Sequence, residues 1–362
     1  MRLSKLFFIS LAMSTRLFAQ DVAVVGTMEQ TLKAPKINTL NKKPASQKIR
    51  LLKMHLSKPA IETLGQRSNA TMNHPSNLIA SSPLPHKIEL GMNNVPVLNQ
   101  GSYGTCVTFA TTAAMDASMN KGDYVSQLCQ LQLGSYLAQN GYAPSGWDGS
   151  IGRLVLTQMD NFGVVNKEKQ KLMGCGGMTE YPQDEQPISD SGMALDQFHQ
   201  LSEHLNETTA WSPILDMYQA TMARTDTNKT LNDIKVALNE KDRVTFAVLL
   251  LDFDLGLMGA VGTHHANFDT WVLTPEIARD IYLRPMFGGH EMVITGYDDD
   301  AIATDEQGHQ HKGLLTLRNS WGNEFGDKGD FYMSYDYFKV LVVEAQRIHS
   351  MPADGGLDAA MV

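Results

Sequence analysis

The order of hydrophobic patterns along the chain limits its fold more than any other feature. From Cys106 to Ala117, apolar residues recur at helical spacing, which indicates a buried central helix. Further helices are predicted at 125–138, 151–162, 193–205 and 214–222. Strand-like runs follow at 244–251, 291–297, 313–318 and 331–335, and the polar loop 298–308 predicts a hairpin between the second and third runs. Helices first and strands later predict an α+β protein with two packed subdomains.

The first ninety residues differ from the rest of the chain. Arg2 and Lys5 precede an apolar run at 6–13 that is too short to span a bilayer, so residues 1–19 are interpreted as a signal peptide. An uncleaved terminal helix is the alternative. Residues 20–90 are rich in Lys, Asn, Ser and Pro, and only 49–56 predicts a short strand or helix. We therefore expect an exported protein, secreted or periplasmic, with a leader and without a later membrane span.

Charge is divided unevenly between the leader and the remainder. Residues 20–90 carry 10 lysines and arginines against 4 acidic residues, whereas residues 91–362 carry 17 against 35. A basic leader beside an acidic body favours an intramolecular partner over a nucleic-acid site. A merely solvated tail is the alternative.

Three residues in distinctive surroundings predict the chemistry. Cys106 follows the glycine-containing turn 99–105, His290 follows two glycines, and Asn319 begins the run Asn-Ser-Trp-Gly. A thiol, an imidazole and an amide are the parts of a cysteine nucleophile, its base and the residue that orients the base. The dipole of the central helix and a nearby imidazolium are expected to lower the pKa of Cys106, and Trp321 is expected to shield the site from water.

The remaining cysteines and polar clusters indicate structure more than chemistry. The chain has 3 cysteines, and the economical pairing joins Cys129 to Cys175 and leaves Cys106 free, although sequence alone does not show that the two meet. His264 and His265 lack further ligands at metal-binding spacing, and the acidic run 298–300 lacks the full pattern of a calcium loop. No metal or cofactor is therefore expected.

Four ordered blocks resemble papain-like cysteine peptidases. Residues 99–110 resemble their nucleophile segment, 288–298 the His segment of bacterial members, 318–329 the Asn-Ser-Trp-Gly block, and 231–249 the helix and strand before the His segment. The resemblance covers most of 91–345 in the correct order. It does not cover the leader, and it is poor at 178–228, which is interpreted as an insertion.

The resemblance implies roles for individual residues. Cys106 would be the nucleophile, His290 the base and Asn319 its orienter, while Gln100 would share an oxyanion hole with the backbone N–H of Cys106. The strip 145–150 would bind the substrate backbone. The candidate substrate-binding residues in it are Gly146, Trp147, Asp148 and Gly149. Tyr103 stands where relatives usually have a cysteine, and Val107 replaces a common aromatic residue.

The family also implies an organisation and a function. A helical left domain (about 91–177) and a β-rich right domain (about 229–345) would form a cleft, which the 20–90 propeptide would fill as an inhibitor. The expected protein is a monomeric, secreted cysteine peptidase made as a zymogen, which acts on a protein or peptide substrate through a thiolate–imidazolium pair and a thioester acyl-enzyme. The alternatives are a binding module on the same fold, and an acyl transferase that acts on protein amines.

Overall fold

The computed structural model describes eleven stretches of the chain: 21–33, 46–73, 83–142, 145–182, 188, 192–205, 207–251, 261–262, 269–283, 286–305 and 307–351. The predicted signal peptide and the His264-His265 pair lie outside the described residues. No helix within these stretches is long and apolar enough to cross a membrane.

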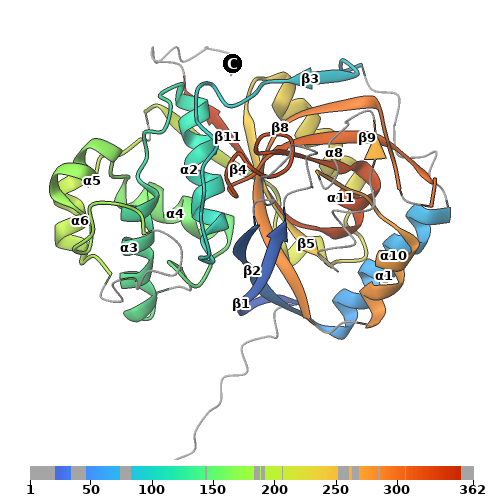
Figure 1. Cartoon of the computed structure of the whole chain (residues 1–362), viewed down its shortest axis with the longest axis horizontal. Coiled ribbons are helices and arrows are strands. Elements are labelled where there is room, and N and C mark those ends of the chain that lie inside the picture. Colours follow the sequence, from blue (N-terminus) through green and yellow to red (C-terminus); the bar gives the residue numbers. More distant parts are fainter. Residues whose placement is uncertain are drawn as a thin grey trace, which may run out of the picture.

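Helices gather on one side of the molecule, shown in cyan and green at the left of Figure 1. They are α2 (Cys106–Met119), α3 (Gln127–Gln139), α4 (Gly152–Phe162), α5 (Lys167–Met173) and α6 (Leu195–Leu201). Every residue of α2 from Cys106 to Ala117 is buried, because this helix packs against both α4 and the sheet. Polar side chains fix the starts of two neighbours: Ser126 accepts the backbone N–H of Cys129, and Asn166 accepts that of Lys169.

A large, mainly antiparallel sheet forms the other side (Figure 1). Its main path runs β4-β11-β5-β8-β9-β10-β7, and β6 pairs with β8 beside it. The strands are β4 (Thr209–Leu215), β5 (Arg243–Leu250), β6 (Val261–Gly262), β7 (Thr270–Trp271), β8 (Met286–Thr304), β9 (Gln310–Arg318), β10 (Asp330–Ser334) and β11 (Val342–Ser350). The helices of this half are α7 (Met217–Ala220), α8 (Thr227–Asn239), α10 (Pro275–Leu283) and α11 (Tyr335–Leu341). All residues of β5 are buried, which places this strand in the centre of the core.

The leader folds onto the sheet. β1 (Val22–Lys33) and β2 (Ser46–Leu56) form an antiparallel pair, and β2 also pairs with the start of β8. α1 (Lys58–Asn73) contacts α10 and α11, and β3 (Lys87–Glu89) pairs with a later part of β8. Figure 1 shows β1 and β2 in dark blue at the lower edge of the sheet, and α1 beside α10.

The α+β class and the two-part architecture are confirmed. The central helix, the helices at 125–138 and 151–162 and the four strand runs are found within a few residues of their predicted limits, although β8 and β9 extend well into the predicted loop 298–308. The predicted helix at 214–222 is wrong: its first residues end β4, which pairs with β11, and only the four-residue α7 follows. The helix predicted at 193–205 is limited to α6. Pairing with β11 decides the first case, and the local periodicity of residues 214–222 carries no information about that distant strand. In the second case the chain leaves the helix after Leu201, and Glu203 bridges to Val164.

Candidate active site

Cys106 begins α2, and its side chain is 0% exposed. The positive end of the helix dipole therefore faces the thiol. The backbone groups of Glu291 and Val107 hydrogen-bond to the sulfur, so the thiol lies against the segment of β8 that carries His290. Glu291 directly follows His290, so the segment that carries the candidate base runs beside the nucleophile where the helical and β-rich halves join.

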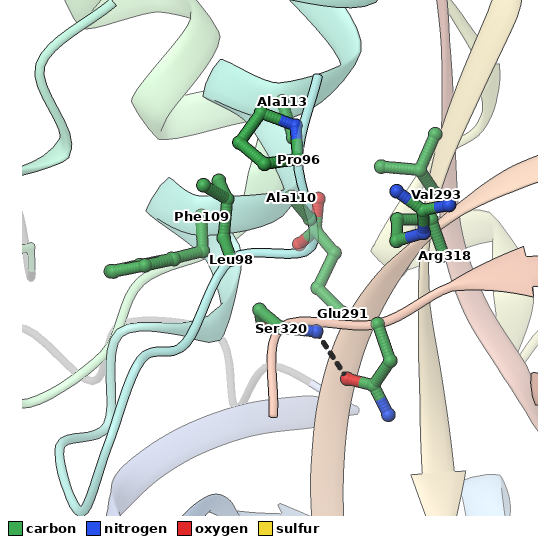
Figure 2. Close-up of a pocket in the computed structure, with 10 residues that line it drawn as sticks. Pro96, Leu98, Phe109, Ala110, Ala113, Glu291, Val293, Arg318 and Ser320 are labelled. Atoms are coloured by element: carbon green, nitrogen blue, oxygen red, sulfur yellow. Dashed lines mark hydrogen bonds between the residues drawn. The ribbon is translucent and has the colours of Figure 1, made fainter. Parts of the chain in front are cut away.

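His290 is held by an amide on one side and an indole on one face. Its Nε2 lies 2.8 Å from Oδ1 of Asn319, directly after β9. The same oxygen accepts the backbone N–H of Ser320 at 2.7 Å, which fixes the orientation of the amide (Figure 2). Since that oxygen can only accept, Nε2 carries a proton and the other ring nitrogen is a free base. Trp321 stacks on the imidazole with ring centroids 4.5 Å apart.

The protonation states differ from the expected thiolate and imidazolium. Burial raises the pKa of Cys106 to about 12, against the effect of its backbone hydrogen bonds. Burial also lowers the pKa of His290 to about 4, although the hydrogen bond from its ring to Asn319 favours the charged form. Both groups are therefore neutral at neutral pH. The predicted lowering of the Cys106 pKa is therefore wrong for the chain with its leader in place. Burial away from water disfavours the thiolate and the imidazolium, and this effect exceeds the stabilisation of the thiolate by the dipole of α2.

Gln100 is fully buried beside the nucleophile turn. Its Nε2 donates to the carbonyl of Tyr103 at 2.8 Å, and its Oε1 accepts the hydroxyl of Ser320 at 2.8 Å. These two bonds lock the amide between the turn and the Asn319 segment. A side-chain amide has two N–H donors, so the contact with Tyr103 uses one of them.

The strip predicted to bind substrate lies against the nucleophile turn. A Cβ atom built on Gly104 would lie 3.2 Å from the carbonyl of Trp147, and Gly149 has a φ of +102°, which a side chain would strain. Trp147 is 5% exposed, and its ring is 5.3 Å from that of Tyr103. Tyr103 therefore fills space between the turn and the strip.

Cys129 and Cys175 form a disulfide in this structure, with their Cα atoms 5.1 Å apart, and Cys106 is free. The bridge ties α3 to the segment after α5. No group of three or more His, Cys, Asp or Glu residues in the described stretches is arranged to hold a metal ion.

Both paired strands of the leader, β1 and β2, contact segments of the site. A Cβ atom built on Gly104 would lie 2.6 Å from the methyl group of Thr27 in β1. Leu52 of β2 stands opposite Gly289 in the ladder and touches Gly149 of the strip. Continuing this register by one residue places Leu51 opposite His290. The strand thus adds to β8 immediately before the candidate base.

Three residues that contact the candidate catalytic residues or the turn before Cys106 were not predicted from the sequence. Tyr181 is within 3.0 Å of the Thr105 hydroxyl and donates to the carbonyl of Gln100 at 2.9 Å. It lies in the segment interpreted as an insertion, where no pattern distinguished it. Ser320 lies within a recognised block, and its small polar side chain gave no signal of its contact with Gln100. Glu291 follows the candidate base, and its burial became visible only in the fold.

Comparison with known proteins agrees with the resemblance recognised from the motifs. Residues 265–350 match the model of the Peptidase C1-like family; the matched segment contains His290 and Asn319 but not Cys106. No curated protein matches the chain.

Among solved structures, xylellain, a cysteine protease from Xylella fastidiosa, is 17% identical with a TM-score of 0.47, over 76% of this chain and 89% of that chain. Digestive procathepsin L 3 of Tenebrio molitor larval midgut is 15% identical with a TM-score of 0.45, over 75% of this chain and 72% of that chain. The bromelain protease of Ananas comosus, solved with the E64 inhibitor, is 14% identical with a TM-score of 0.44, over 74% of this chain and 99% of that chain.

Proposed function

We propose that the protein is a cysteine peptidase made as a zymogen, with Cys106 as nucleophile, His290 as base and Asn319 as its orienter. The observation that carries the proposal is the 2.8 Å contact between His290 Nε2 and Asn319 Oδ1, which leaves the second ring nitrogen as a base beside the thiol segment. A buried imidazole oriented in this way is suited to accept a proton from a thiol and to return it.

The reaction follows from these positions. His290 accepts the thiol proton, and the thiolate sulfur attacks the substrate carbonyl carbon. Gln100 and the backbone N–H of Cys106 stabilise the oxyanion. The imidazolium then protonates the leaving amine as the C–N bond breaks, which leaves a thioester. His290 next takes a proton from water, the resulting hydroxide attacks the thioester, and the proton returns to the departing sulfur.

The leader is the second part of the proposal. We assign residues 1–19 to an export signal, 20–90 to an inhibitory propeptide and 91–362 to the peptidase domain, and we infer a secreted or periplasmic protein. The pairing of β2 with residues 286–289 supports inhibition, because a substrate strand at the same edge would need the same backbone groups. Inhibition is also supported by the burial of Cys106 and His290, which keeps both side chains uncharged at neutral pH.

The contacts also define how the leader is held. Ion pairs contribute at its end, where Lys87 lies 3.1 Å from Asp298. Over the site, the contact is made by strand pairing and by buried apolar side chains, among them Leu51, Leu52 and Met54. Over the site, the leader is therefore attached mainly by strand pairing and apolar packing, and its excess positive charge contributes less there.

The proposal is tested by hydrolysis of an unfolded protein substrate with the full chain and its Cys106→Ala variant. We expect hydrolysis by the unaltered chain once the leader is displaced, and none by the variant, with equal thermal unfolding of the two. Retention of hydrolysis in the variant contradicts the mechanism. Selective peptide binding without turnover by the unaltered chain supports a binding module instead.

A further inference from the structure

One buried carboxyl beside the nucleophile has no role in the proposed reaction. Glu291 follows His290 in β8, is 1% exposed, and hydrogen-bonds to the sulfur of Cys106 through its backbone. Figure 2 shows its side chain pointing from β8 toward α2 near Ala110. Because Ala110 follows Cys106 by about one helical turn, the carboxyl lies against the end of α2 that carries the nucleophile.

The side chain of Glu291 borders a small cavity between the two halves of the molecule. Apolar residues of α2 and of the segment 96–98 line this cavity together with residues of β8 and β9, among them Arg318. Oε2 of Glu291 has no hydrogen-bond partner among the described residues. None of the lining residues belongs to the leader, so these surroundings of Glu291 remain when the leader is displaced.

A second buried carboxyl meets Glu291 at Gly152. Glu344 of β11 is 2% exposed and accepts the backbone N–H of Gly152 at 2.9 Å and that of Arg153 at 3.0 Å. A Cβ atom built on Gly152 would lie 2.8 Å from Oε1 of Glu291. Both glutamates also stand opposite Ala247 of β5, on the two strands that flank it. Two buried negative charges placed together are costly, so one of the two carboxyls keeps its proton.

The hydrogen bonds decide which carboxyl is neutral. Glu344 receives two backbone N–H groups at the start of α4 and the side-chain amide of Gln346, and donors of this kind favour a carboxylate. Glu291 lacks such donors at Oε2, and burial together with the charge of Glu344 raises its pKa well above the ordinary range. Glu291 is therefore the protonated member of the pair.

The other charged groups around the pair leave this proton in place. Arg153 lies 3.1 Å from Asp216, and Arg318 lies 2.6 Å from Asp330, so both guanidinium groups already have a carboxylate partner. Cys106 and His290, which flank Glu291, are neutral at neutral pH. A negative charge on Glu291 would raise the pKa of the thiol further, because it repels the thiolate in surroundings that hold little water.

We propose that Glu291 is a positioning residue that serves as a neutral carboxylic acid behind Cys106, and that the release of its proton sets the upper pH limit of the peptidase. The inference rests on the proposed peptidase function. Glu291 transfers no proton to the substrate. At high pH it gives its proton to water and then places a negative charge beside the sulfur, so the thiolate forms less readily and attack on the substrate slows. Glu344 keeps Glu291 neutral, and its replacement should lower this pH limit.

The first test measures the proton on Glu291 without catalysis. In the full chain carrying Cys106→Ala, the infrared absorption of protonated carboxylic acids is recorded against pH, with and without Glu291→Gln. We expect a band at neutral pH that Glu291→Gln removes and that disappears as pH rises, with its midpoint at lower pH in Glu344→Gln. Identical spectra of the two proteins at neutral pH overturn the proposal, because Glu291 is then already ionised.

The second test measures the thiol itself, as the rate at which iodoacetamide alkylates Cys106 in the full chain with its leader strand loosened by Leu51→Ala. The rate with Glu291→Gln, divided by the rate without it, should be close to one while Glu291 is protonated. Above the infrared midpoint it should rise about tenfold, because one pKa unit of the thiol changes the thiolate fraction tenfold. Asp116→Asn is the matched control, since Asp116 is another buried carboxyl of α2. A ratio independent of pH, or the same rise in the control, overturns the proposal.

Peptide hydrolysis separates this proposal from the peptidase function. The ratio of kcat/KM with and without Glu291→Gln should rise with pH as the alkylation ratio does. A rise in the alkylation ratio without hydrolysis by either protein supports the role of Glu291 and contradicts the peptidase function. Hydrolysis with a ratio independent of pH overturns the role of Glu291 alone. Where Glu291→Gln does not fold, Glu344→Gln decides: hydrolysis should then be lost at lower pH than in the unaltered chain, and an unchanged limit overturns the proposal.

Discussion

Loosening the leader strand should expose the thiol, and Leu51 is the residue to change. Its side chain is 0% exposed and touches Gly288 beside the candidate base. Replacement of a buried Leu by Ala costs about 3 kcal/mol. If β2 can detach from β8 while the remainder of the chain stays folded, the substitution lowers the free energy of this detachment by the same amount. Each 1.4 kcal/mol changes an equilibrium constant tenfold, so the fraction of molecules with β2 detached rises roughly a hundredfold.

The assay is the rate at which a peptidyl epoxide alkylates Cys106 in the full chain at neutral pH. We expect Leu51→Ala to increase this rate roughly a hundredfold, because water entering the site also removes the burial that raises the pKa of the thiol. Leu131→Ala is the control, since Leu131 is equally buried but lies in α3. Equal rates in Leu51→Ala and the unaltered chain, or equal acceleration by Leu131→Ala, would refute the reasoning.

Two further predictions concern other buried polar groups. Gln100→Ala should lower kcat about a hundredfold with little change in KM, because the oxyanion donor acts in the transition state; steady-state kinetics showing a change in KM alone would contradict this role. Burial raises the pKa of Asp116 to about 8, against hydrogen bonds from the backbone of Val125 and Tyr124. A raised carboxyl pKa gives stability that is complete below pH 3.8 and is lost as pH rises through 8, so unfolding free energy should fall by up to about 1.4 kcal/mol per pH unit in this window. Asp116→Asn should flatten the slope, and an equal slope in both proteins would rule out Asp116 as its source.

The local motifs predicted more of the site than of its surroundings. Cys106, His290 and Asn319 each lie in a short segment whose neighbours mark a helix start, a strand and a strand end, so their partners could be inferred from the fold class. The contact of Ser320 with Gln100 joins residues 220 positions apart and required the folded chain. The same holds for Tyr181, which no recognised block contains.

The leader shows the limit of sequence analysis most clearly. Residues 49–56 predicted a strand or a helix equally, and the choice depends on β8, which supplies the edge that β2 joins. The protonation of Cys106 could not be predicted either. Its helix position favours a thiolate, but the sulfur is fully buried in the folded chain, and burial outweighs the dipole.

The central claim is that the thiol of Cys106, activated by His290, forms a thioester with the acyl part of a peptide substrate. The most direct test is intact-protein mass spectrometry of the Leu51→Ala full chain, quenched in acid during turnover of a slowly hydrolysed peptide ester. The account predicts a mass increase equal to the acyl group, located on Cys106 by fragmentation and absent in His290→Ala. An adduct on another residue, or turnover without an adduct and without loss in Cys106→Ala, would contradict it.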